Sequence, residues 1–179
     1  ESGWKLYDLK EKMSINDLQV VSSNYTVRKF TVDDRDTSLA TATFKPGEPV
    51  KRGGATSDFV ILLADGEPIV ASTIFIGIVD SVSTETATAE GDVAVKVVRE
   101  GTEIQGKAKT ASTADTQSEI NDLKMNTTVF DLTSGAFTID AAAADTTPSN
   151  GLVILDGDPV KSTLIVGVMS DVTLFHTQR

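Results

Sequence analysis

The chain has 179 residues, enough for one domain with its own core, and no cysteine, which excludes disulfides and thiolate metal or redox sites. Its 26 acidic and 16 basic side chains give a formal net charge of −10, so neither a nucleic acid nor an anionic membrane surface is expected as a partner. The single histidine, His176, leaves little basis for a serine triad or a histidine-ligated zinc site.

Residues 1–24 differ in composition from the rest of the chain and contain its only tryptophan. Their apolar positions keep neither a helical nor a strand period for long, which predicts an arm with at most one short helical turn. Residues 25–32 then alternate, with Val27 on one face, Phe30 on the other and charges on both. This pattern predicts an edge strand. We therefore expect an arm and edge strand in residues 1–37 and a β-barrel from residue 38 to residue 179.

Short apolar or alternating runs separated by glycine turns predict most of the remaining strands. Thr116-x-x-Glu119 spells a capping box, and it predicts one helix of about nine residues with Ile120 and Leu123 on its apolar face. Ser134-Gly135 predicts a hairpin turn, and residues 141–150 are predicted to be a loop. The fold class is all-β, a small antiparallel β-barrel or sandwich with one short helix and an extended N-terminal arm. The predicted strands are residues 39–44, 59–63, 69–82, 84–89, 93–99, 102–106, 129–132 and 136–140.

Two segments of the chain share a pattern in which Asp-Gly, an acidic residue and proline precede an apolar strand with an internal glycine. A third, shorter copy begins at Gly47. In each copy we predict a tight turn at the glycine and a proline at the first residue of the strand, where no ladder hydrogen bond is lost. Duplication of one β-unit and convergent turn chemistry remain alternative explanations. The predicted turn residues are Gly47, Pro49, Gly66, Pro68, Gly157 and Pro159.

No segment of the sequence spells a specific catalytic or metal site. The acidic clusters at residues 33–36 and 156–158 lack the spacing and the terminal bidentate glutamate of a calcium loop. Lys51-Arg52-Gly53-Gly54 lacks the Gly-Lys-Ser/Thr of a phosphate loop. The longest apolar runs have six residues, whereas a membrane-spanning helix needs about 20. We expect no cofactor, no metal, no catalysis, no secretory signal and synthesis in a cytoplasm.

The arm is the segment where a functional interpretation is strongest. Large aromatic side chains are favoured anchors at protein interfaces and are costly to leave in water. The alternative is that the arm folds back onto its own barrel. The predicted contact residues of the arm and edge strand are Trp4, Leu6, Tyr7, Leu9, Val27 and Phe30.

Across residues 38–132 the chain resembles the head decoration proteins, or capsid cement proteins, of tailed bacteriophages, including the lambda type. The resemblance rests on Gly47-Glu48-Pro49-Val50, Asp65-Gly66 and Ile76-Gly77-Ile78, with the turns at Gly91 and Gly101 and the helix at residues 119–124. It implies a homotrimeric β-barrel on the outer capsid surface of the virion, bound to the major capsid protein and bridging capsomers. By the same comparison, residues 133–179 are a C-terminal extension.

Two other functions remain open from the residues themselves. A carbohydrate- or receptor-binding β-module of a phage tail or cell surface would need an exposed aromatic platform. A hydrolase would need two carboxylates in one cleft, one of them with a raised pKa.

Overall fold

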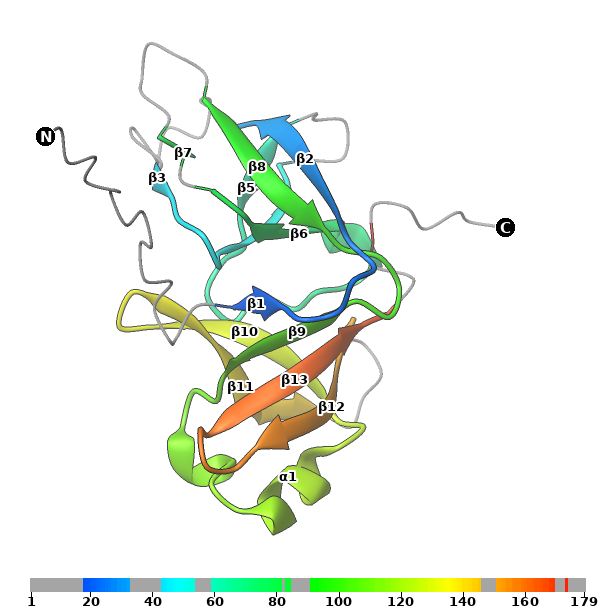
Figure 1. The fold of residues 1–179 in the computed structure, drawn as a ribbon, viewed down its shortest axis with the longest axis vertical. Helices are drawn as coiled ribbons and strands as arrows, with labels where there is room; N and C mark the ends of the chain where they lie inside the picture. The colour runs from blue at the N-terminus through cyan, green and yellow to red at the C-terminus, as the bar shows by residue number, and fades with distance from the viewer. Residues whose placement is uncertain are drawn as a thin grey trace, which may run out of the picture.

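The computed structural model describes residues 18–32, 43–53, 59–81, 83–84, 91–145, 151–169 and 173. It confirms the all-β class with one short helix. Figure 1 shows two β units stacked along the long axis, a five-stranded barrel above a curled six-stranded sheet, with α1 (Gln117–Leu123) beyond the lower sheet.

The barrel is antiparallel and its strands run in the order β2-β8-β6-β4-β5. A parallel bridge between Val32 and Val60 joins its first and last strands. Alternation places Val93, Val95 and Val97 of β8 inside, as expected for a strand with one buried face. Short strands β3 (Thr43–Phe44) and β7 (Ser83–Thr84) pair beside it. The barrel strands are β2 (Thr26–Thr31), β4 (Pro49–Arg52), β5 (Val60–Leu62), β6 (Phe75–Val79) and β8 (Asp92–Val97).

The lower sheet runs in the order β1-β9-β13-β12-β10-β11. It curls until Ala108, just after β9, forms a bridge with Ile139 of β11. Its inner face and α1 enclose a core that includes Ile104, Ile120 and Leu164. The strands are β1 (Gln19–Val20), β9 (Glu103–Lys107), β10 (Thr127–Thr133), β11 (Ala136–Asp145), β12 (Leu152–Asp158) and β13 (Thr163–Val168).

Strand β6 is buried on both faces because it is a wall shared by two cores. Ile76 and Val79 pack inside the barrel, whereas Phe75 and Ile78 pack into the core of the lower sheet. A bulge makes this possible, since Val50 pairs with Gly77 but Lys51 pairs with Phe75. The Phe75 ring lies 6.0 Å from that of Phe130 on β10, which joins the two units through apolar contact.

The capping box forms as the sequence predicts. Thr116 Oγ accepts a hydrogen bond from the Glu119 N–H at 3.3 Å, and Glu119 accepts one from the Thr116 N–H at 3.0 Å. The helix has seven residues, and Ile120 anchors it in the core. The predicted hairpin is confirmed too, with positive φ at Ser134 (53°) and Gly135 (82°), the conformation of a tight hairpin turn.

Two predicted elements are wrong. Residues 69–82 are not one strand, because Ala71–Thr73 form the 3₁₀ helix η1 before β6 begins at Phe75. The predicted loop at residues 141–150 is strand as far as Asp145, because a run of alanines continues β11. A second 3₁₀ helix, η2, covers Ala111–Thr113 ahead of α1.

The domain boundaries drawn at residues 37 and 133 are not structural divisions in the part of the chain that is described. Leu18 is 1% exposed in the lower core, β1 pairs with β9, and β2 is a barrel strand. Strands β11, β12 and β13 make up half of the six-stranded sheet. Residues 18–32 are therefore part of the folded unit and not of an arm.

The copies of the turn pattern at Gly47 and Gly66 differ in their proline. Gly47 and Gly66 lie in turns with positive φ of 89° and 63°. Pro49 is the first residue of β4, where its missing N–H costs no ladder bond. Pro68 is not at the start of a strand; it lies in the loop ahead of η1.

The turn predicted at Gly157 is wrong. Gly157 lies inside β12 opposite Leu164, and a Cβ there would lie 2.5 Å from the backbone oxygen of Thr163. The glycine thus permits close approach of two strands, and the turn falls at Pro159 and the residues after it. The two long copies of the pattern form different local structures, a 3₁₀ turn and a hairpin.

Gly77→Ala should lower the free energy of unfolding by about 3 kcal/mol, because a Cβ at this position would overlap the backbone carbonyl of Lys96 on β8. The control is Gly66→Ala, whose Cβ would meet no atom within 4 Å and whose cost is backbone strain of about 1 kcal/mol. Urea unfolding measures both. Equal losses would contradict the close approach of β6 to β8 at Gly77.

Candidate functional site

The predicted contact residues of the arm, Trp4, Leu6, Tyr7 and Leu9, lie outside the described residues. Val27 and Phe30 are both on β2, but the structure separates them. Val27 is 45% exposed on the outer face of the barrel, opposite Lys96 of β8. Phe30 is half-buried against the barrel core. Of these two described side chains, Val27 is the exposed one.

Val27 belongs to an exposed apolar row with Val21 and Tyr25, which are 46% and 37% exposed. The ammonium group of Lys96 lies 5.7 Å from the centre of the Tyr25 ring and 3.2 Å from the Asp80 carboxylate. A cation over the ring face orients the aromatic side chain. We call Val21, Tyr25 and Val27 the β1–β2 row; it follows the chain from the lower sheet to the barrel.

The connection between β1 and β2 is held by polar contacts rather than by a core. The Glu103 N–H donates to Ser22 Oγ at 2.9 Å, and Ser22 Oγ donates to Asn24 Oδ1 at 2.6 Å. The Asn24 amide donates to the Glu100 carbonyl at 3.2 Å. These bonds tie the connection to the β8–β9 turn, so the apolar row stands on a fixed backbone.

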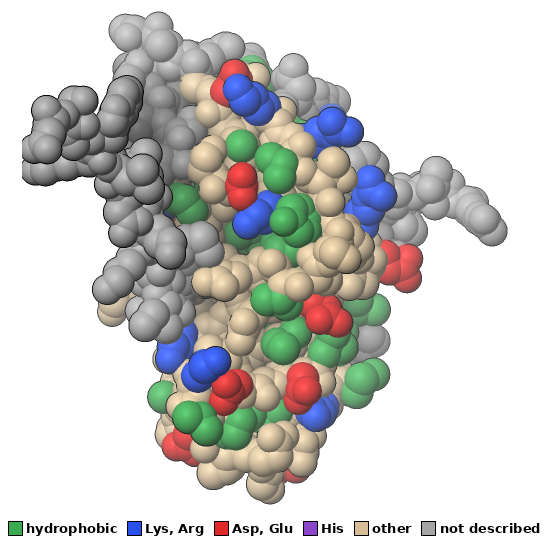
Figure 2. Space-filling model, viewed as in Figure 1, with side chains coloured by type: hydrophobic (Ala, Val, Ile, Leu, Met, Phe, Trp, Pro, Cys, Tyr) green, Lys and Arg blue, Asp and Glu red, His purple; other side chains and the backbone are tan. Residues whose placement is uncertain are grey.

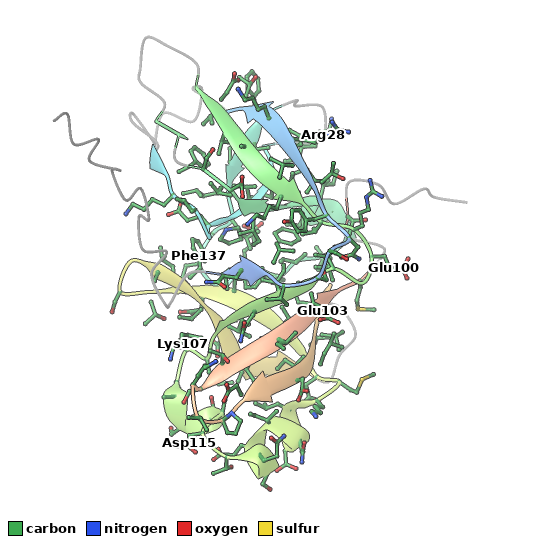
Figure 3. The ribbon with its side chains drawn as sticks, viewed as in Figure 1. Arg28, Glu100, Glu103, Lys107, Asp115 and Phe137 are labelled. Atoms are coloured by element: carbon green, nitrogen blue, oxygen red, sulfur yellow. The ribbon has the colours of Figure 1, made fainter. Side chains whose placement is uncertain are left out.

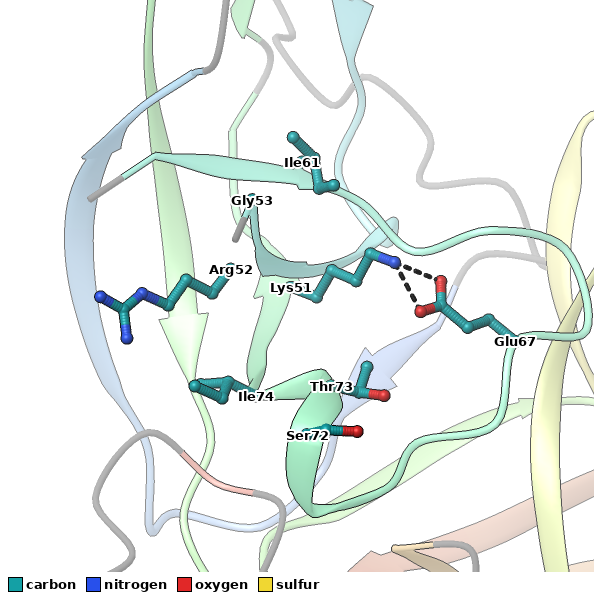
Figure 4. A pocket seen from close by; sticks show the side chains of 8 residues that line it. All are labelled: Lys51, Arg52, Gly53, Ile61, Glu67, Ser72, Thr73 and Ile74. Atoms are coloured by element: carbon teal, nitrogen blue, oxygen red, sulfur yellow. Dashed lines mark hydrogen bonds and ion pairs between the residues drawn. The ribbon is translucent and has the colours of Figure 1, made fainter. Parts of the chain in front are cut away.

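The pocket in Figure 4 lies against β4, β5 and η1 and has a volume of about 520 Å³. Lys51 and Glu67 form an ion pair across it, with Nζ–Oε distances of 2.5 and 2.6 Å, and Arg52 points away toward β2. The Ala64 N–H also donates to Glu67. None of the eight lining residues is aromatic, so the pocket offers no stacking platform for a sugar.

A second polar cluster closes the curled lower sheet. Lys109 Nζ lies 2.7 Å from Asp131 Oδ2 and 2.9 Å from Asp140 Oδ2, and the Lys109 N–H donates to the Ile139 carbonyl. Each aspartate side chain is 12% exposed. The remaining Asp131 oxygen accepts from the Thr133 hydroxyl. The cluster therefore acts as an ionic clasp between β10, β11 and the chain after β9.

The electrostatics of the clasp oppose acid catalysis. Burial raises the pKa of Asp131, but the hydrogen bonds from Lys109 and Thr133 outweigh it and hold that pKa below its usual range. The same contacts, with Asp131 first and Asp140 second, raise the pKa of Lys109. A general acid needs a carboxyl group whose pKa is raised. The lowered pKa of Asp131 therefore fits a role in stabilising the fold.

The acidic cluster at residues 156–158 lies at the end of strand β12, and the turn begins after it. Asp158 accepts hydrogen bonds from the Val160 and Lys161 N–H groups, and Asp156 forms an ion pair with Lys124 at 2.9 Å. Within the described ranges no group of three or more His, Cys, Asp or Glu side chains is placed to hold a metal ion. In that same part of the chain, no helix has the length and apolar character to cross a membrane.

A comparison with known protein families found no matching family model, and a comparison with curated proteins found no match.

Lys109→Gln should lower the free energy of unfolding at pH 7, because two nearly buried carboxylates would lose their counter-ion. The pKa of Asp131 is lower in the folded state than in the unfolded state. The ionised carboxylate therefore contributes to the free energy of unfolding above the unfolded pKa of about 3.9, and this contribution is lost as the pH falls through the folded pKa. The difference in the free energy of unfolding between wild type and Lys109→Gln should therefore become smaller below about pH 4.

Urea unfolding between pH 3 and pH 8 measures this difference. Lys161→Gln is the control, since Lys161 is 69% exposed and lies 3.5 Å from Asp158 in a surface pair of small value. A Lys109→Gln effect that is independent of pH, or no larger than that of the control, would show that the clasp is not what closes the sheet.

Proposed function

We propose that this protein is a structural component of a tailed-bacteriophage virion that binds the outer surface of the capsid, with the major capsid protein as its partner, and bridges neighbouring capsomers. The observation that carries the proposal is the β1–β2 row, an exposed set of apolar side chains on a fixed backbone. The resemblance of residues 38–132 to capsid cement proteins supports it.

The charged side chains described above fit a protein that acts by binding better than one that acts by catalysis. Lys51 with Glu67, Lys96 with Asp80 and the Lys109 clasp are ion pairs within the fold. They stabilise a rigid frame whose exposed apolar side chains remain for contact with a partner. Many copies with modest individual affinity would stiffen a shell, because every bridge must break before capsomers part. The homotrimer implied by the resemblance stays a prediction, tested by sedimentation of the purified protein.

Cosedimentation with undecorated capsids tests the function directly. The proposal predicts saturable binding of the full chain to shells and no binding to shells that already carry a full complement of it. Absence of binding, or turnover of a substrate by the purified protein, would overturn the proposal.

Deletion of residues 1–17 should weaken shell binding at least about tenfold, since aromatic anchors typically dominate interface energy. The deletion must stop before Leu18, because this side chain is 1% exposed in the core and β1 pairs with β9. A flexible Gly/Ser segment of the same length in place of residues 1–17 is the control for chain length. Unchanged binding of both variants, with circular dichroism like that of wild type, would exclude the arm as an anchor.

A further inference from the structure

A second exposed surface lies on the outer face of β9, β13 and β12. On these strands Ile104, Leu164, Val166, Leu152 and Ile154 point into the core. The alternate positions therefore face outward, and several of them are apolar. Leu155 and Met169 are each 38% exposed, Val21 next to Glu103 of β9 is 46% exposed, and Val153 and Ile165 are half-buried. We call these five residues, with Glu100 and Glu103, the β9–β13–β12 patch.

Gly167, which has no side chain, lies at the centre of the patch. Gly167 pairs with Glu103 on one side and with Val153 on the other. The Leu155 side chain lies over it, so a Cβ at Gly167 would be 2.9 Å from a Leu155 methyl group. A register shift in β12 between Ile154 and Asp156 turns Leu155 onto this face. The result is a low apolar surface of the kind that a partner protein can cover.

Two glutamates lie among the apolar side chains. The Val21 N–H donates to the Glu103 carbonyl, and the Gly101 N–H donates to the Val168 carbonyl, which brings Glu100 next to Met169. Figure 3 shows Glu100 and Glu103 toward one end of β9 and Lys107 toward the other. In Figure 2, acidic side chains stand between hydrophobic ones on the lower half of this face. No ion pair of either glutamate occurs among the residues described.

The apolar side chains and the two glutamates together define which kind of partner surface fits the patch. Covering the apolar side chains would also remove water from Glu100 and Glu103, and a carboxylate that loses water without gaining a counter-ion opposes binding. A partner surface with apolar side chains and neighbouring lysines or arginines satisfies both requirements. A second acidic surface, including the same patch of another copy, would place like charges together.

We infer that the β9–β13–β12 patch is the face that docks on the capsid shell, and that the shell surface it meets is apolar at its centre and basic around it. The inference rests on the proposed function and adds the face and the partner's chemistry to it. The predicted arm joins the fold at Leu18, next to β1, and β1 is the strand that borders β9. An arm anchored on the shell would therefore bring this face toward it.

The test is cosedimentation of the full chain with undecorated capsids. The variant Glu100→Lys with Glu103→Lys should bind about tenfold or more weakly than wild type, since it places two positive charges against a partner surface that is expected to be basic. The control is Asp92→Lys with Asp122→Lys, which makes the same net charge change at exposed positions on β8 and α1. The control should bind like wild type.

A second pair of variants separates apolar contact from charge. Met169→Ser should weaken binding, whereas Val160→Ser, at a 92% exposed position in the β12–β13 turn, should not. Circular dichroism establishes that each variant is folded. The docking face would be overturned if the wild type binds and neither patch variant weakens that binding, or if all variants weaken it equally. Either result would leave the proposed function intact. Absence of wild-type binding would overturn both.

Discussion

Burial of β6 on both faces is the constraint on which the rest of the structure depends. A strand shared by two cores must present apolar side chains in both directions, and the bulge between Phe75 and Gly77 lets Phe75 and Ile78 face the lower sheet while Ile76 and Val79 face the barrel. Because the two units share this wall, the barrel and the sheet are fixed to each other by apolar contact, including that of Phe75 with Phe130. Surfaces on the two units can then act as one surface.

The sequence predicts local structure well where a few neighbouring residues decide it. The capping box at Thr116, the hairpin at Ser134-Gly135 and the alternation in β8 are of this kind. It fails where distant strands decide. Gly157 has the spelling of a turn, but its role is set by the Thr163 backbone of the next strand. The all-apolar run of β6 resembles any buried strand, and nothing in it shows that two separate cores receive its side chains.

The candidate site shows the same division between local and distant information. Val27 is recognisable as an outward residue from the alternation of β2, whereas its partners in the exposed row, Val21 and Tyr25, owe their positions to the Ser22 and Asn24 hydrogen bonds with the β8–β9 turn. The clasp of Lys109, Asp131 and Asp140 joins residues that carry no common motif. Ion pairs of Lys51, Lys96 and Lys109 hold parts of the fold together, whereas the apolar side chains of the β1–β2 row stay exposed.

Electron cryomicroscopy of undecorated capsids incubated with the full chain tests the central claim most directly. The account predicts density for two stacked β units on the outer surface of the shell, with each copy in contact with neighbouring capsomers and with strands β9, β13 and β12 turned toward it. Shells without added density, or bound copies whose β9–β13–β12 face is turned to solvent, would contradict it.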